Sequence, residues 1–208
     1  MSSHLKKLGN DYMRMALILF LITSIIGGML AAVHYFTAPV AERFAEERLN
    51  RSLFELIDGA DEFVKVVEYP ESILLGTVQV PIRAAYRAID SVDESLGYCI
   101  NVTPMGYADI IDMMVAIDKD GLVSGVEILS ISDSPGISSK VKANDELQTA
   151  LKGINDPVKI VKTPPTSKTE VQVIAGATIS SAAYINGVNA AVEVAQLLRV
   201  EEVPDENQ

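Results

Sequence analysis

The chain has 208 residues, of which 49% are hydrophobic and 22% charged, with a net charge of −11 and a mean hydropathy of +0.24. Few soluble domains average above zero hydropathy, so part of the chain must be strongly apolar. The only charged residues before residue 42 are Lys6, Lys7, Asp11 and Arg14, so residues 42–208 carry a net charge of −13. A part this acidic repels nucleic acid, whose binding proteins need a cationic surface, and we predict no nucleic-acid partner.

The acidic part of the chain also lacks several reactive groups. Both histidines, His4 and His34, precede it, and its only cysteine is Cys99. A Ser-His-Asp triad, a histidine-ligated zinc, an all-cysteine iron–sulfur cluster and an internal disulfide are therefore excluded there. Cys99 lies in an alternating strand pattern and is predicted to be a buried, small apolar residue. We predict no catalytic side chain and no metal site, so redox chemistry would need an organic cofactor.

The first elements are predicted to be a polar tail over residues 1–14 and a transmembrane helix over residues 15–37. No Asp, Glu, Lys or Arg occurs between Met15 and Ala41, and about 20 apolar helical residues span a ~30 Å hydrocarbon layer. A retained single-pass anchor is favoured over a cleaved signal because the apolar run exceeds a normal signal core. Three Lys or Arg residues stand near each end of the span, so the positive-inside rule does not decide its orientation.

Residues 38–60 are predicted to form an amphipathic stalk helix. Leu49, Leu53, Leu56 and Ile57 follow a helical spacing, and Asp58-Gly59 is a typical helix end. The stalk is either a solvated connection between membrane and domain or a face for a neighbouring subunit. Membrane lipid is a predicted partner of the preceding span.

Residues 61–199 are predicted to form one α+β domain with antiparallel hairpins and flanking helices. Strand patterns cover residues 63–69, 84–89, 97–102, 110–118 and 122–129, and the segment 90–95 (DSVDES) is a predicted hairpin turn. The DKDG sequence at 118–121 lacks the further oxygen ligands and flanking helices of a calcium-binding EF-hand. Asp109 and Asp112 near this hairpin are predicted to be surface charges, and a sodium path is the alternative.

The rest of the domain is predicted to contain two helices separated by a linker. A loop centred on Pro135-Gly136 covers residues 130–139, and a helix covers 140–160. Residues 162–168 are a linker, and a final helix carries the apolar stripe Ile185, Val188, Val192 and Ala195. Residues 200–208 are predicted to be a disordered tail.

The segment 171–181, VQVIAGATISS, reads as a strand that passes through a glycine turn into this final helix. Thr178 stands at the helix start, where unpaired backbone N–H groups and the helix dipole suit a phosphate group. Gly176 allows a tight turn, and Ala175 and Ala177 leave room beside it. Ser and Thr are also ordinary N-cap residues, so this spacing by itself leaves a phosphate site and a simple helix cap both open.

The sequence AGATISS resembles the flavinylation motif S/T-G-A-T-x-S/T of the FMN-binding domain family. This family is shared by the G subunit of the Rnf electron-transport complex, the C subunit of the sodium-translocating NADH:quinone reductase and the NosR-type regulators. Gly106-Tyr107 and the following DIIDMMVAIDKDGLVSGVEIL resemble the family's central hairpin, and SPGIS at 134–138 is similar to its TPGLG loop. The departures are Ala175 in place of Ser or Thr, Gln172 in place of an acidic residue, and Ile137-Ser138 in place of Leu-Gly.

The resemblance implies that FMN is bound covalently, through a phosphoester to Thr178 formed by a flavin transferase. It also implies that the cofactor-binding residues extend around this threonine and into the Pro-Gly loop, which lies against the flavin ring in the family. These residues are Ala175, Gly176, Ala177, Ile179, Ser180, Ser134, Pro135 and Gly136.

The total length resembles the G subunit of Rnf more than the longer protein of the quinone reductase. The resemblance implies an electron-carrying subunit of a membrane-bound, ion-translocating ferredoxin:NAD oxidoreductase, with the other subunits and the flavin transferase as partners. It places the chain in a bacterial or archaeal cell (inner) membrane, with the flavin domain on the non-cytoplasmic side. The alternatives are the C subunit of a sodium-translocating NADH:quinone reductase and a membrane-anchored, non-redox assembly module with a decayed flavin motif.

Overall fold

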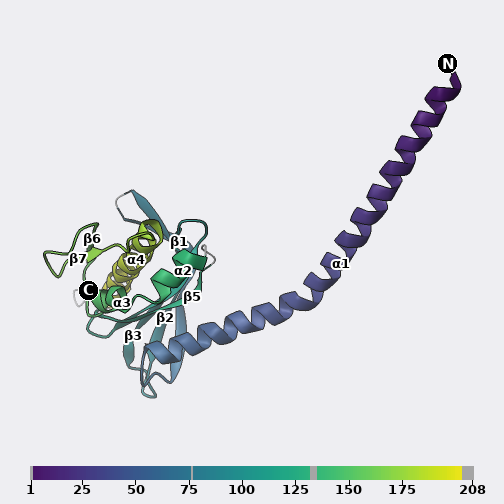
Figure 1. Cartoon of the computed structure of the whole chain (residues 1–208). Helices are drawn as coiled ribbons and strands as arrows, with labels where there is room; N and C mark the ends of the chain where they lie inside the picture. Colours follow the sequence, from purple (N-terminus) through teal and green to yellow (C-terminus); the bar gives the residue numbers. More distant parts are fainter. Residues whose placement is uncertain (1, 76, 132–134, 203–208) are drawn as a thin grey trace. The chain divides into compact units, whose positions relative to one another are not determined.

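The structure of the chain is a computed structural model that describes residues 2–75, 77–131 and 135–202 (Figure 1). It divides into two compact units, residues 1–48 and 49–208. Predictions for Ser134 and for the tail beyond residue 202 lie outside the described residues.

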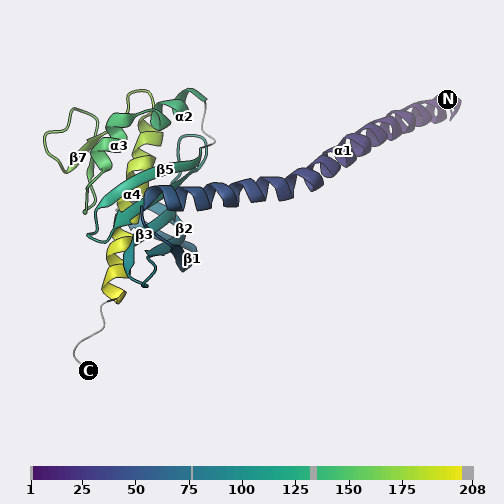
Figure 2. The ribbon, with the colours of Figure 1, turned by 90° about the horizontal axis from the view of Figure 1, so that it is seen from below.

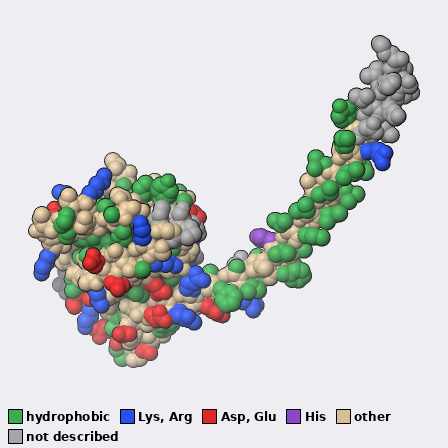
Figure 3. All heavy atoms as spheres, in the orientation of Figure 1, with side chains coloured by type: hydrophobic (Ala, Val, Ile, Leu, Met, Phe, Trp, Pro, Cys, Tyr) green, Lys and Arg blue, Asp and Glu red, His purple; other side chains and the backbone are tan. Residues whose placement is uncertain are grey.

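The first unit consists of helix α1 (Ser2–Leu56) up to Arg48, so the predicted tail, the span and most of the stalk lie within one helix. One stretch of α1 is long and apolar enough to cross a membrane. Figure 3 shows hydrophobic side chains along this helix. The hydroxyl of Thr23 donates to the carbonyl oxygen of Leu19 (3.0 Å), and that of Thr37 donates to that of Val33 (2.8 Å). Such bonds would satisfy these hydroxyl groups if the helix crosses a membrane, where no water is present to pair with them.

The second unit is built on a five-stranded antiparallel sheet in the order β1-β2-β3-β4-β5. The strands are β1 (Glu62–Leu75), β2 (Val78–Ile89), β3 (Ser95–Val102), β4 (Ile111–Asp118) and β5 (Val123–Ile131). The predicted turn at 90–95 is confirmed, because Asp90 closes it by accepting hydrogen bonds from the N–H groups of Val92 and Glu94, both at 2.9 Å. The predicted class, an antiparallel sheet with flanking helices, is therefore confirmed.

Both faces of the central strands are covered, which explains why β4 reads as an almost continuous apolar run. Met113, Val115 and Ile117 belong to the core cluster that contains helix α4 (Thr178–Glu202). Met114 and Ala116 point to the opposite face, where they join Leu53 from the last turns of α1. Successive strand residues alternate between faces, so two buried faces require apolar residues at every position.

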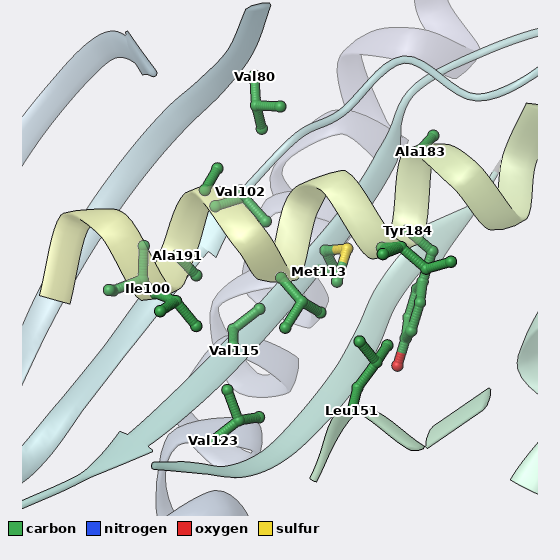
Figure 4. Packing of buried hydrophobic residues seen from close by; sticks show 14 of the residues in the cluster. Val80, Ile100, Val102, Met113, Val115, Val123, Leu151, Ala183, Tyr184 and Ala191 are labelled. Carbon is green, nitrogen blue, oxygen red and sulfur yellow. The ribbon is translucent and has the colours of Figure 1, made fainter. Parts of the chain in front are cut away.

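Helix α4 packs along the sheet, and Figure 4 shows buried hydrophobic residues of the core that the two share. The predicted stripe Ile185, Val188, Val192 and Ala195 is fully or almost fully buried. Close approach depends on Gly187, since a Cβ there would lie 2.8 Å from the Met113 sulfur and 3.0 Å from Pro104 Cγ. Figure 2 shows α4 against the sheet in a second view.

The segment of the sequence that connects β5 to α4 differs from the prediction. Instead of a loop followed by one helix, it holds α2 (Pro135–Lys142), α3 (Asp145–Leu151) and the parallel strands β6 (Lys159–Val161) and β7 (Glu170–Gln172). Proline is well suited to the first position of a helix, so Pro135 begins α2 rather than a turn. Asn144 then caps α3, because its side-chain oxygen accepts a hydrogen bond from the Leu147 N–H (2.6 Å). The predicted linker at 162–168 is irregular, as expected.

Gly97 offers a direct test of the sheet geometry. Its φ is +141°, and a Cβ at this position would overlap the carbonyl oxygen of Ile117 on the neighbouring strand. We expect Gly97→Ala to lower the free energy of unfolding by about 3 kcal/mol or more, since backbone strain and a backbone clash add. Gly153→Ala is the matched control, because Gly153 also has a positive φ (+78°) but open space around its Cβ.

The control should lower the free energy of unfolding by only about 1–2 kcal/mol. Urea unfolding of the detergent-solubilised chain, followed by the near-ultraviolet circular dichroism of its tyrosines, measures both values. Equal losses for the two variants would contradict the contact at Gly97.

Candidate functional site

The candidate site is the turn that connects β7 to α4. The Ala177 N–H donates to the carbonyl oxygen of Ile174 (3.0 Å), which closes a four-residue turn with Gly176 at its third position. Gly176 has a φ of +76°, a conformation that glycine adopts without steric cost. Thr178 is the first residue of α4, at the helix start where the sequence placed it, and its side chain is exposed.

Backbone geometry makes this turn a natural place for an anion. The first hydrogen bond of α4 runs from Ser181 N–H to Ala177 O (2.9 Å), so the amide groups of Thr178 and Ile179 have no partner within the helix. The positive end of the helix dipole lies at the same point. Ala175 and Gly176 are exposed beside it, which leaves the turn open to an approaching group.

The two serines that follow Thr178 are fully buried and hold the site in shape. The Ser181 hydroxyl donates to Ala177 O (2.9 Å) and accepts from the Ile174 N–H (3.0 Å), so it ties the turn to the helix. The Ser180 hydroxyl accepts from the Tyr107 N–H (3.2 Å), so it ties a distant loop to the helix. Ser180, predicted as a cofactor-binding residue, thus contacts the Tyr107 backbone.

The Tyr107 loop joins β3 to β4 and is closed by backbone hydrogen bonds. The Gly106 N–H donates to Asp109 O (2.9 Å), the Ile111 N–H donates to Pro104 O (2.9 Å), and Met105 and Ile110 form an isolated bridge. The sequence resemblance covered this loop but gave it no role. Its position next to α4 depends on tertiary contacts between residues 73 positions apart.

Two cavities flank the turn. One of about 310 Å³ is lined by Tyr107 and by the residues Gly176, Ala177, Thr178, Ile179 and Ser180. The other, of about 340 Å³, lies between α3 and β7, and its lining includes Glu146, Glu170 and Ala175 but not Thr178. Hydrogen bonds from the Thr166 backbone N–H and hydroxyl, both at 2.9 Å, lower the pKa of Glu170. The second cavity is the more acidic of the two, because two carboxylates belong to its lining.

Sequence reasoning missed one cation at the turn. A Cβ built on Gly176 would lie 2.8 Å from the Nζ atom of Lys140, so this amino group lies directly beside the turn. Lys140 belongs to α2, which begins at Pro135 and has Gly136 as its second residue. Helix α2 contacts α4. An isolated lysine in a helical pattern carries no sequence signal for such a role. Ser134, the remaining predicted residue of this segment, lies outside the described residues.

Other candidate groups are engaged elsewhere. Asp112 forms an ion pair with Arg83 (2.8 Å) and accepts a hydrogen bond from the buried Asn101 amide (2.7 Å). Cys99 is fully buried, as predicted, and burial raises the pKa of its thiol to about 12. Within the described residues, no group of three His, Cys, Asp or Glu side chains is arranged to hold a metal ion.

Comparison with known proteins agrees with the resemblance at the turn. Residues 106–193 match the family model of the FMN-binding domain. The chain is 28% identical over 200 residues to the G subunit of the Na(+)-translocating ferredoxin:NAD(+) oxidoreductase complex of Acetobacterium woodii, with 89% of this chain and 92% of the relative covered. It is 29% identical over 174 residues to the G subunit of the proton-translocating ferredoxin:NAD(+) oxidoreductase complex of Clostridium ljungdahlii, with 83% and 85% covered.

Among solved structures, the chain is similar to NqrC of Shewanella oneidensis at 14% identity and a TM-score of 0.40. That similarity covers 63% of this chain and 64% of the other. The matched residues 106–193 of the family model begin within the Tyr107 loop and run through the turn into α4, so they include Lys140 and the residues that line the cavity at Thr178.

Proposed function

We propose that this chain, an FMN-binding protein homologous to the G subunits of ion-translocating ferredoxin:NAD oxidoreductases, is the electron-carrying subunit of such a membrane complex. The observation that carries the proposal is the match of residues 106–193 to the FMN-binding domain, because those residues build the turn, the Tyr107 loop and the cavity between them. The other subunits of the complex are its proposed partners, and helix α1 anchors it to the membrane.

The second part of the proposal is that FMN is attached to Thr178. The Thr178 hydroxyl oxygen forms a bond to the FMN phosphorus of FAD, the pyrophosphate P–O bond breaks, and AMP leaves while the hydroxyl proton passes to a base. A flavin transferase supplies that base and the FAD. Exposure of Thr178 at the helix start supports this role, because the acceptor must reach the active site of another enzyme.

The residues around Thr178 fit a phosphodiester. The amide groups of Thr178 and Ile179, which have no acceptor within the helix, and the Lys140 amino group offer a positive environment. Among the residues that the structure describes, no acidic side chain lines the cavity that contains Thr178. Flavin supplies one- and two-electron chemistry when bound. The chain itself holds and orients the group, and both of its histidines lie in α1, outside the domain.

Removal of the acceptor hydroxyl tests the attachment. We expect Thr178→Ala to lose covalent flavin completely, and its free energy of unfolding to change by only about 0.5 kcal/mol because the side chain is exposed. The intact wild-type chain should exceed the apoprotein mass by FMN less one water, and should fluoresce in a denaturing gel under ultraviolet light.

Ser180→Ala is the control for the choice of hydroxyl, and it should keep covalent flavin because Ser180 is buried. Attachment that survives in Thr178→Ala but not in Ser180→Ala would contradict the assignment. A wild-type chain that is colourless after co-expression with the transferase would instead favour the non-redox assembly module.

The charge of Lys140 is tested by the rate of attachment. We expect Lys140→Gln to slow the transfer of FMN about two- to five-fold at low salt, the range of a partly exposed ionic contact. Lys140→Arg should retain the rate, and Lys142→Gln, two residues further along the same helix, should leave it unchanged. The effect should shrink in about 0.5 M salt, a concentration at which surface charges are well screened. Equal rates of FMN transfer for wild type and all three variants would contradict a role for the Lys140 charge in attachment.

The flavin domain is proposed to lie on the non-cytoplasmic side of the membrane. We expect Lys168→Cys, in the exposed 162–168 linker, to react with a membrane-impermeant maleimide in intact spheroplasts. The native chain should remain unlabelled at neutral pH, because Cys99 is buried and has a pKa of about 12. Ser3→Cys, on the other side of the span, is the matched control and should be labelled only after lysis. The reverse pattern would contradict this orientation.

A further inference from the structure

Two large apolar side chains are exposed beside Thr178. Tyr107 is 61% exposed and Ile179 is 54% exposed, and both line the cavity of about 310 Å³ that also contains Thr178. Neither side chain belongs to the buried core clusters. An aromatic and an aliphatic side chain on a shared, open cavity favour a flat apolar ligand over a charged one.

The backbone presents Tyr107 from a fixed position. Ser180, fully buried in the first turn of α4, accepts a hydrogen bond from the Tyr107 N–H (3.2 Å), and the Gly106–Asp109 hydrogen bond tightens the loop (2.9 Å). The hydrogen bond to Ser180 fixes the distance between the Tyr107 loop and Thr178.

The second cavity is a poorer place for a flavin ring. Its lining includes the carboxylates of Glu146 and Glu170 and lacks Thr178. Two carboxylates beside the ring would disfavour reduced flavin, because reduction adds negative charge. A ring tethered at Thr178 would also have to pass around the turn to enter this cavity.

We propose that Tyr107 is a positioning residue whose ring stacks on the isoalloxazine ring of the FMN attached at Thr178, with Ile179 beside it. This inference rests on the proposed function. Tyr107 would then cover one face of the flavin and set which face and edge stay open to an electron partner. A stacked phenol donates an electron to an excited flavin, so the native protein should be dimmer than its denatured form.

The test uses the full chain, solubilised in detergent after co-expression with the flavin transferase. We expect Tyr107→Ala to keep its fluorescence in a denaturing gel, to be several-fold brighter than wild type when native, and to be more strongly quenched by iodide. Tyr107→Phe should also be brighter, because a phenyl ring donates electrons poorly, but should keep the low iodide quenching of wild type. Met105→Ala is the matched control, since Met105 is exposed (67%) in the same loop and does not line the cavity.

The outcomes separate this inference from the proposed function. Normal attachment with unchanged native fluorescence and unchanged iodide quenching in Tyr107→Ala would overturn the stacking alone. Absence of covalent flavin from the wild-type chain would overturn the proposed function and the stacking with it. If Tyr107→Ala prevents attachment, the native flavin fluorescence of Tyr107→Phe tests the stacking instead. A Tyr107→Phe fluorescence equal to that of wild type would overturn the stacking.

Discussion

The packing of α4 against the central strands is the constraint on which the rest of the domain depends. The sheet buries both faces of β3 and β4, so α4 and the end of α1 must each cover one face. The close approach at Gly187 and Met113 fixes where α4 lies on the sheet, and the Asn189 side chain binds it to Val158 through two hydrogen bonds of 2.9 Å. The core therefore holds the first turn of α4 in place, and with it the backbone of Thr178.

Local hydrogen bonds convert this fixed helix end into a defined site. Ser181 ties the turn to the helix, Ser180 ties the Tyr107 loop to the same turn, and Gly176 makes the turn sterically possible. Burial raises the pKa of the Tyr184 phenol on the α4 side of the sheet and that of the Cys99 thiol on the opposite face, so both groups stay protonated at neutral pH.

The sequence predicted the turn and the sheet better than the groups that complete the site. A glycine followed by Thr178 and an apolar stripe is a local pattern, and so is the alternation of the strands. Helix α2 was missed because Pro135 and Gly136 favour a turn when read locally, although proline also suits the first position of a helix. Lys140 and Tyr107 reach the turn only through tertiary contacts, and such contacts leave no periodic signal in the chain.

Under the proposed function, a covalent link to Thr178 explains how a small, exposed cavity can retain its cofactor. The cavity of about 310 Å³ lies at the small end of ligand sites, which measure about 300–1,000 Å³ and bury about 70–90% of their ligand, and two residues of its lining, Tyr107 and Ile179, are more than half exposed. Such a surface would release a dissociable flavin readily. A phosphoester at Thr178 removes that requirement, because retention no longer depends on burial. The ring can then remain exposed at the surface of the domain, where neighbouring redox proteins of the complex can approach it closely enough to exchange electrons.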